Sequence, residues 1–136
     1  MALAGDLRVA LMYAVRRIRA ERSSSDITDG QYQVLAALAN RGPMSPTALA
    51  EDQRVQPPHV TRMLNALTGG GLVERGEHPT DKRQVVVSIT EAGLAEVKET
   101  RRRRNEWLAG RLGRLDAAER EVLAQAVLLL RRITDE

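Results

Sequence analysis

The chain has 136 residues, 43% of them hydrophobic and 29% charged, with no cysteine, no phenylalanine, one tryptophan and two tyrosines. This length suits one domain or two small lobes, and the lack of cysteine excludes disulfides and thiolate-bound zinc. The formal net charge is +3, but residues 43 to 90 carry equal numbers of acidic and basic side chains, so global charge by itself does not indicate a nucleic-acid partner.

The first predicted helix runs from about Asp6 to Glu21 and carries one apolar stripe at a spacing of three to four residues. Asp6 and Arg8 interrupt the apolar residues early. The segment is therefore neither a signal peptide nor a membrane span, and no membrane partner is expected. Together with the lack of cysteine, this pattern favours a cytoplasmic protein.

A second helix is predicted after Thr28, which pairs with Gln31 in a capping box, and it stops at Gly42, where a left-handed conformation is expected. A short helix then begins at Ser45, a suitable N-cap followed by proline. Another helix begins at Pro57 and ends in three glycines. Two helices joined by a tight turn form a helix-turn-helix.

Two strands are predicted next, Leu72 to Gly76 and Gln84 to Ile89, and the second alternates so that Val85, Val87 and Ile89 share one face. The connection between the strands is longer than the two to five residues of an ordinary hairpin. A hairpin connection of this length more often has a function than merely joins two strands.

Thr90 is expected to cap a long helix that extends to roughly Leu112, and Asp116 opens a last helix with Glu119 in capping-box position. The apolar stripe of this last helix comprises Val122, Leu123, Ala126, Val127, Leu130 and Ile133. The long terminal helices cannot bury such stripes against so small a middle domain. Packing against a second copy of the chain is therefore predicted.

The run Arg101 to Arg104 lies within the long helix. Four consecutive helical residues span most of the circumference, so they cannot all face one partner. Acidic residues at helical spacing, including Glu99 and Glu106, can neutralise part of the run. A mostly solvated, salt-bridged segment is expected, with one or two arginines reaching toward DNA or the other subunit.

The second helix of the helix-turn-helix has an inner face of Val60, Met63, Leu64 and Leu67. That phase makes Pro58, Arg62 and Asn65 point outward, flanked by His59, Thr61 and Ala66. The outward face offers a cation, hydrogen-bonding side chains and no acid, which suits base edges and phosphates. A DNA-reading face is favoured over an ordinary solvated one.

The hairpin tip contains Asp81, Lys82 and Arg83. Asp81 is expected to hold the Arg83 guanidinium by bidentate hydrogen bonding, so that the guanidinium enters a narrow A·T-rich minor groove. Lys82 would contact the flanking phosphates. The competing interpretation is a solvated turn, because proline, threonine, aspartate and lysine are ordinary turn residues.

Catalytic and metal-binding patterns are weak. The two histidines are separated by the first strand, no carboxylates cluster, and no nucleophile stands beside a base. Neither an enzyme, a metal site nor a cofactor is expected. A winged-helix protein-interaction module that never touches DNA stays open as an alternative, since the middle of the chain is formally neutral.

The stretch HVTRMLNALTGGGLVERGEHPTDKRQVVVSITEAG, preceded by MSPTALAED, resembles the multiple-antibiotic-resistance regulator (MarR) family of transcription factors. The order of helices extends the resemblance over nearly the whole chain. It implies a mainly α fold with a small β-hairpin (α+β): a winged helix-turn-helix over residues 28–90, with long N- and C-terminal dimerisation helices in residues 1–27 and 91–136.

The resemblance also implies a homodimer that binds a palindromic operator in double-stranded DNA and is released by a small, often phenolic, effector. By position, it assigns Gln56, Pro58, His59, Thr61 and Arg62 to the recognition helix, Asp81 and Arg83 to the wing, and Ser45 and Thr47 to phosphate contacts. Tyr13, Arg17, Tyr32 and Trp107 are the candidates for an effector pocket.

Overall fold

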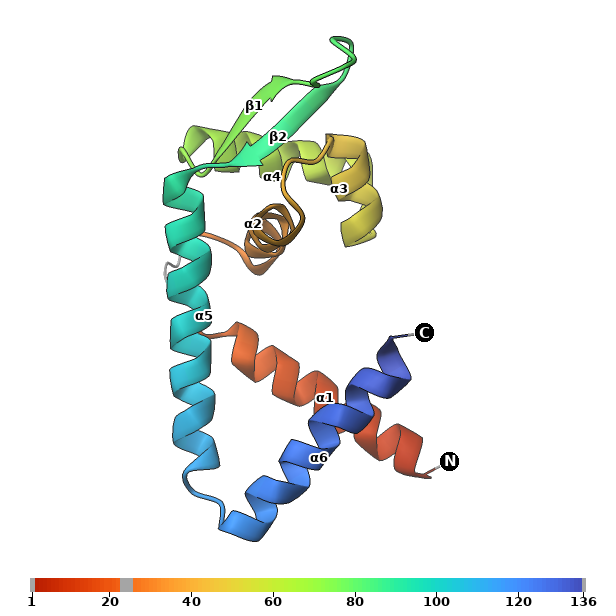
Figure 1. The fold of residues 1–136 in the computed structure, drawn as a ribbon, viewed down its shortest axis with the longest axis vertical. Coiled ribbons are helices and arrows are strands. Elements are labelled where there is room, and N and C mark those ends of the chain that lie inside the picture. The colour runs from red at the N-terminus through yellow and green to blue at the C-terminus, as the bar shows by residue number, and fades with distance from the viewer. Residues whose placement is uncertain (1, 23–25, 136) are drawn as a thin grey trace.

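A long helix, α5, runs through both halves of the molecule in the computed structural model, which describes residues 2–22 and 26–135 (Figure 1). The elements in chain order are α1 Ala2–Arg19, α2 Asp29–Arg41, α3 Pro46–Gln53, α4 Pro57–Gly69, β1 Val73–Glu77, β2 Val85–Ile89, α5 Glu91–Leu112 and α6 Ala117–Thr134. One half holds α2, α3, α4 and the hairpin, and we call it the DNA lobe after the role that the sequence predicts for it. The other half holds α1 and α6, and we call it the arm. The mainly helical fold with one antiparallel hairpin confirms the predicted fold class.

Polar caps begin the helices where the sequence predicts them. The side chain of Thr28 accepts from the backbone N–H of Gln31, whose own side chain accepts from the N–H of Thr28. Asp116 and Glu119 make the same reciprocal pair at the start of α6. Thr90 caps α5, which ends at Leu112 as predicted. These bonds satisfy N–H groups that a helix start leaves without partners.

The core of the DNA lobe forms where α2, α3 and α4 meet the hairpin. Its fully buried large side chains include Leu35, Leu38, Leu49, Val60, Leu64, Leu67 and Val87. Ser45 caps α3 through its hydroxyl, and Pro46 occupies the first turn, as predicted. The apolar phase of α4 is confirmed, because Val60, Met63, Leu64 and Leu67 are its buried residues.

The hairpin gains a third backbone partner that the sequence did not predict. Strands β1 and β2 pair antiparallel from Val73 opposite Ile89 to Glu77 opposite Val85. Met44, in the link between α2 and α3, exchanges two backbone hydrogen bonds with Val87, of 2.8 and 3.0 Å. Val87 is buried, but Val85 is exposed because the hairpin has left the lobe by that point. Alternation predicts that Val85 shares a face with Val87 and Ile89 but not how far along the strand that face is covered.

Arg54, which follows α3, has the left-handed helical conformation that the sequence analysis expects at Gly42, which follows α2. Gly42 has φ +83° and ψ −168°, so its φ is positive as only glycine readily allows, but its ψ is extended rather than left-handed helical. Arg54, after α3, has φ +54° and ψ +46° and is left-handed. The left-handed stop predicted at Gly42 is therefore wrong in detail.

The arm helices bury none of their own residues in a single chain. α1 begins at Ala2, four residues before the predicted start, and ends at Arg19. Exposed large apolar residues on the two helices include Leu3, Met12, Tyr13, Val122, Leu123, Val127, Leu128, Leu129 and Ile133. No helix in the described part of the chain is long and apolar enough to cross a membrane.

Gly93 sets how closely α5 approaches the hairpin. A Cβ added there would lie 2.6 Å from Cγ1 of Ile89 and closer still to the carbonyl oxygen of Leu72. Thr90, three residues earlier, donates its hydroxyl to the carbonyl of Gly71 at 2.7 Å and thereby fixes the same junction. A backbone atom cannot move aside as a flexible side chain can, so only glycine fits here.

We expect Gly93→Ala to lower the free energy of unfolding by about 1–3 kcal/mol, the usual cost of overpacking a tight contact. Gly110→Ala in the same helix is the matched control, because its Cβ would meet nothing within 4 Å. The control should be neutral or stabilising by roughly 0.5–1 kcal/mol. Urea unfolding followed by circular dichroism measures both; equal stabilities for the two variants would contradict the close approach.

Candidate nucleic-acid interface

Helix α4 turns a row of polar side chains away from the core. Pro57 and Pro58 occupy its first turn, and the preceding Gln56 makes no side-chain cap hydrogen bond, so its amide is free to contact another molecule. The exposed residues of this row are Gln56, Pro58, His59, Thr61, Arg62, Asn65 and Ala66. The hydroxyl of Thr61 donates to the carbonyl of Pro57 at 3.1 Å and keeps its oxygen as an acceptor. Helix α4 contains no acidic residue.

The start of α2 lies beside the first half of α4. His59, Arg62 and Met63 line a shallow hollow of about 430 Å³ together with Thr28, Gly30 and Gln31. A Cβ at Gly30 would sit 3.2 Å from Sδ of Met63, so the two helices are in close contact here. Arg62 thus stands next to the positive end of the α2 dipole.

Arg75 of β1 is a component of this surface that sequence reasoning missed. Its Nη2 donates to Oδ1 of Asn65 at 2.7 Å, which joins the wing strand to the exposed face of α4. A guanidinium carries only donors, so the carbonyl end of the Asn65 amide must face Arg75 and the NH₂ end must face away. The only signal in the sequence was an unexplained arginine in a strand.

The wing tip, residues 78–84, is shaped by two side-chain acceptors. Nδ1 of His78 accepts from the backbone N–H groups of Thr80 and Asp81, at 3.2 and 3.1 Å. Oδ1 of Asp81 accepts from the backbone N–H of Arg83 at 3.0 Å and from its Nε at 3.3 Å. A single carboxylate oxygen is used, so the expected bidentate pairing is wrong. The role of His78 was not predicted.

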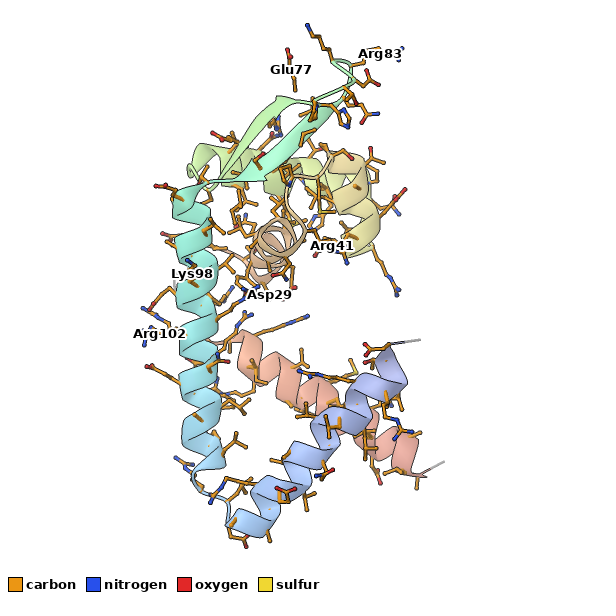
Figure 2. All side chains as sticks on the ribbon, viewed as in Figure 1. Asp29, Arg41, Glu77, Arg83, Lys98 and Arg102 are labelled. Atoms are coloured by element: carbon orange, nitrogen blue, oxygen red, sulfur yellow. The ribbon has the colours of Figure 1, made fainter. Side chains whose placement is uncertain are left out.

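The Arg83 side chain is 91% exposed and projects from the tip of the wing (Figure 2). Because only its Nε is bound, both terminal nitrogens are left to donate to another molecule. Lys82 is exposed beside it. The half-exposed carboxylate of Asp81 holds one side of the Arg83 guanidinium, and the two terminal nitrogens on the other side have no bond to the described residues. The loop therefore presents a cation in a defined direction.

Ser45 and Thr47 lie at the start of α3. The oxygen of Ser45 accepts from the N–H of Ala48 at 3.1 Å, and its hydroxyl hydrogen stays available as a donor. Thr47 is exposed and Ser45 is half-buried. Both residue types can contact phosphate from such a position.

The four effector-pocket candidates occupy three places. Tyr13 lines a cavity of about 660 Å³ on α1. Arg17 stacks on Trp107 of α5, with 4.3 Å from its guanidinium carbon to the ring centre. Tyr32 is buried, and the guanidinium of Arg104 stacks on its ring at 4.3 Å. Within residues 2–22 and 26–135, these contacts place the four side chains in the α1 cavity, at the α1–α5 contact and in the core of the DNA lobe; a shared effector pocket stays a prediction.

Metal chemistry has no support in the described residues, 2–22 and 26–135, where no three histidine, aspartate or glutamate side chains gather as ligands. The surface of α4 is built from hydrogen-bonding side chains and one cation, and the wing adds Arg75, Lys82 and Arg83 beside the exposed acids Glu74 and Glu77. Such a surface is suited to binding a polyanion with hydrogen-bonding groups.

Comparison with known proteins agrees with this geometry. A family model described as "MarR family" matches residues 27–85. An HTH-type transcriptional regulator of Mycobacterium tuberculosis, MT0903.1, is 45% identical over 98% of this chain and 94% of its own length.

Two solved structures of MarR from Escherichia coli share the architecture. The wild-type apo form aligns with a TM-score of 0.80 at 28% identity, over 98% of each chain. A mutant of the same protein complexed with operator DNA aligns with a TM-score of 0.70 at 28% identity, over 98% of this chain and 94% of that one.

Proposed function

The chain belongs to the MarR family of transcriptional regulators, and from that premise we propose that it is a homodimer that binds a palindromic DNA operator through α4 and the wing. We propose further that it represses its target genes and is released by a small molecule. Its relatives are named as transcriptional regulators, which gives no support to an enzyme and does not favour a winged-helix module that avoids DNA.

The observation that carries the proposal is the continuity of the polar face of α4 with the wing. The hydrogen bond between Arg75 and Asn65 joins the two elements, which supports one binding surface that extends from Arg62 to Arg83. No acid of α4 interrupts it. A helix that reads the major groove and a wing that reaches the minor groove need this arrangement.

Each candidate residue has a role by its chemistry. Arg62 can donate two hydrogen bonds to a guanine edge, and Gln56, His59, Thr61 and Asn65 can contact base edges or sugar-phosphate nearby. Pro58 packs against the groove wall. Arg83 enters the minor groove, steadied by Asp81, while Lys82, Ser45 and Thr47 contact phosphates.

Uncovered apolar side chains on the arm support the homodimer. Leu123, Val127 and Ile133 of α6 are 44, 47 and 65% exposed, and Met12 and Tyr13 of α1 are 63 and 70% exposed. So much apolar surface is rarely left to solvent by a monomer. A two-fold dimer would cover it and set two copies of α4 about one helical turn, roughly 10 bp, apart. In this proposal residues 1–27 and 91–136 dimerise and residues 28–90 bind DNA.

The cavity on α1 supports release by a small molecule. Its wall combines apolar side chains, among them Leu11 and Val15, with Arg16, Arg19 and Arg22. It lies where the arm meets the DNA lobe, since Asp29 at the start of α2 also lines it. A ligand with an apolar body bound in this cavity would contact both the arm and the DNA lobe, and would therefore act on their relative orientation.

Replacing the two candidate base-reading arginines should have different effects on binding. After duplexes are selected from a random pool, Arg62→Ala should cost about 1–3 kcal/mol and relax preference at particular base pairs. Arg83→Ala should weaken binding most where the flanks are A·T-rich. Arg83→Lys is the matched control for charge. If Arg83→Ala leaves affinity unchanged on every selected duplex, the wing does not enter the groove.

Lys82→Ala should lower affinity almost equally for all sequences and reduce the slope of log K against log salt by about 1, as expected for one lost phosphate contact. Lys98→Ala removes the same charge from α5, away from the wing (Figure 2), and should leave the slope unchanged. Titrations at several salt concentrations measure both. Equal slopes for both variants would argue against a phosphate contact by Lys82.

Leu123→Asp should raise the dimer dissociation constant roughly 100-fold or more, because a carboxylate without a partner would be buried in the interface. Gln125→Asp introduces the same charge on another side of α6 and should leave the dimer intact. Sedimentation equilibrium distinguishes the two. A wild-type protein that is monomeric at micromolar concentration would contradict the dimer.

A further inference from the structure

The four arginines at 101–104 have four different sets of partners, although Arg102 and Arg103 share Glu99. The Nη2 of Arg101 donates to Asn40 of α2 at 2.9 Å. Arg102 bonds only within its own helix, to Glu99 and Glu106. These contacts agree with the expectation of a salt-bridged segment. Hydrogen bonds from Arg102, and then from Arg103, lower the pKa of Glu99 to about 2, so this carboxylate stays charged at any working pH.

Arg103 and Arg104 reach from α5 to the end of α1 and the residues that follow it. Nε of Arg104 donates to the carbonyl of Glu21 at 3.0 Å, and its Nη2 donates to the carbonyl of Arg19 at 3.3 Å. Arg103 donates to the carbonyl of Arg22 at 3.1 Å. Two guanidinium groups from α5 thus bind the last residue of α1 and the backbone just after it. That one or two of the four arginines approach DNA or the other subunit stays a prediction.

Arg104 also contacts α2. Its Nη2 lies 3.5 Å from Oδ1 of Asp29, and its guanidinium stacks on Tyr32, a core residue of the DNA lobe. Asp29 is paired at 3.5 Å with Arg19 as well. The Arg104 side chain is only 12% exposed, whereas that of Arg102 is 53% exposed. The Arg104 side chain, which belongs to α5, therefore contacts both α1 and α2.

The guanidinium of Arg104 has the chemistry needed to hold α1 against the other helices. The last carbonyls of α1 have no partners within the helix, and that end carries the negative pole of its dipole. A guanidinium satisfies both needs, because it presents several donors in a planar fork and stays charged. Since α1 buries no side chain in one chain, little packing within the chain opposes a change in its direction.

We propose that Arg104, assisted by Arg103, is a positioning residue that sets the direction of α1 relative to the DNA lobe and thereby the spacing of the two half-sites. The inference rests on the proposed homodimer. α1 belongs to the arm, and in a dimer the arm fixes where the partner's lobe stands. The 18 residues of α1 extend about 27 Å, so a rotation of about 10° moves its far end by roughly 5 Å, more than one base pair.

The test uses full-length protein and duplexes carrying two selected half-sites whose separation varies in steps of one base pair. The wild type should have a sharp optimum and lose roughly tenfold or more in affinity two base pairs away from it. Arg104→Gln should flatten or shift that optimum, with a loss of less than about threefold at the same offset, while it still dimerises and binds a single half-site. Arg104→Lys, which keeps the charge but loses the fork, should be intermediate.

Arg102→Gln is the matched control, since it removes a neighbouring arginine that touches only α5, and it should keep the wild-type optimum. If Arg104→Gln lowers the thermal midpoint but leaves the optimum and its sharpness unchanged, Arg104 only stabilises the fold and the inference is overturned. Should Arg104→Gln fail to fold, Arg104→Lys and Arg103→Gln decide by the same measurement. If the wild type selects no duplex, the proposed DNA-binding function is wrong. This outcome is distinct from a failure of the inference about Arg104.

Discussion

The continuity of α5 is the constraint on which the rest of the structure depends. Its first turns are part of the DNA lobe, where Gly93 admits the carbonyl of Leu72 and Val97 is buried. Its later turns extend beside the arm (Figure 1). There Trp107 meets Arg17 of α1, and Arg104 bonds the carbonyl of Arg19 while it stacks on Tyr32 of the DNA lobe. A helix is stiff along its axis, so the contact at one end determines where the other end lies. Each half of the molecule is placed relative to the other through this element.

The charge of this protein acts through its placement, because the net value is only +3. Several acids of the DNA lobe are engaged by arginines: Asp52 pairs with Arg41, and Asp81 holds the backbone and Nε of Arg83. Helix α4 itself contains no acid, and the Arg83 fork stays open because Asp81 engages only its Nε. A formally neutral segment can therefore present a locally cationic face, and such local fields, rather than the total charge, govern contact with a polyanion.

Most of the local structure followed from the sequence, because it is decided by neighbours along the chain. Thr28, Asp116 and Thr90 cap the helices at the predicted residues, and the period of α4 places its buried and exposed sides correctly. Some misses involve partners far apart in sequence, such as Met44 with Val87, whereas those at Gly42 and in the wing tip are local. The alternation of β2 predicts a face but not whether another element covers it, so the exposure of Val85 did not follow from it.

The sequence by itself therefore determined which elements form, which sides of them are apolar, and which family the chain resembles, since caps, periods and turn residues act over a few positions. Only the tertiary structure decided which cations meet which acceptors. Arg75 bonds Asn65 across ten residues and Arg104 bonds Glu21 across eighty-three, and four adjacent arginines with one chemistry acquired four different sets of partners. The reason is geometric: successive helical side chains diverge by about 100°, and what each one meets depends on the packing of helices that are remote in sequence.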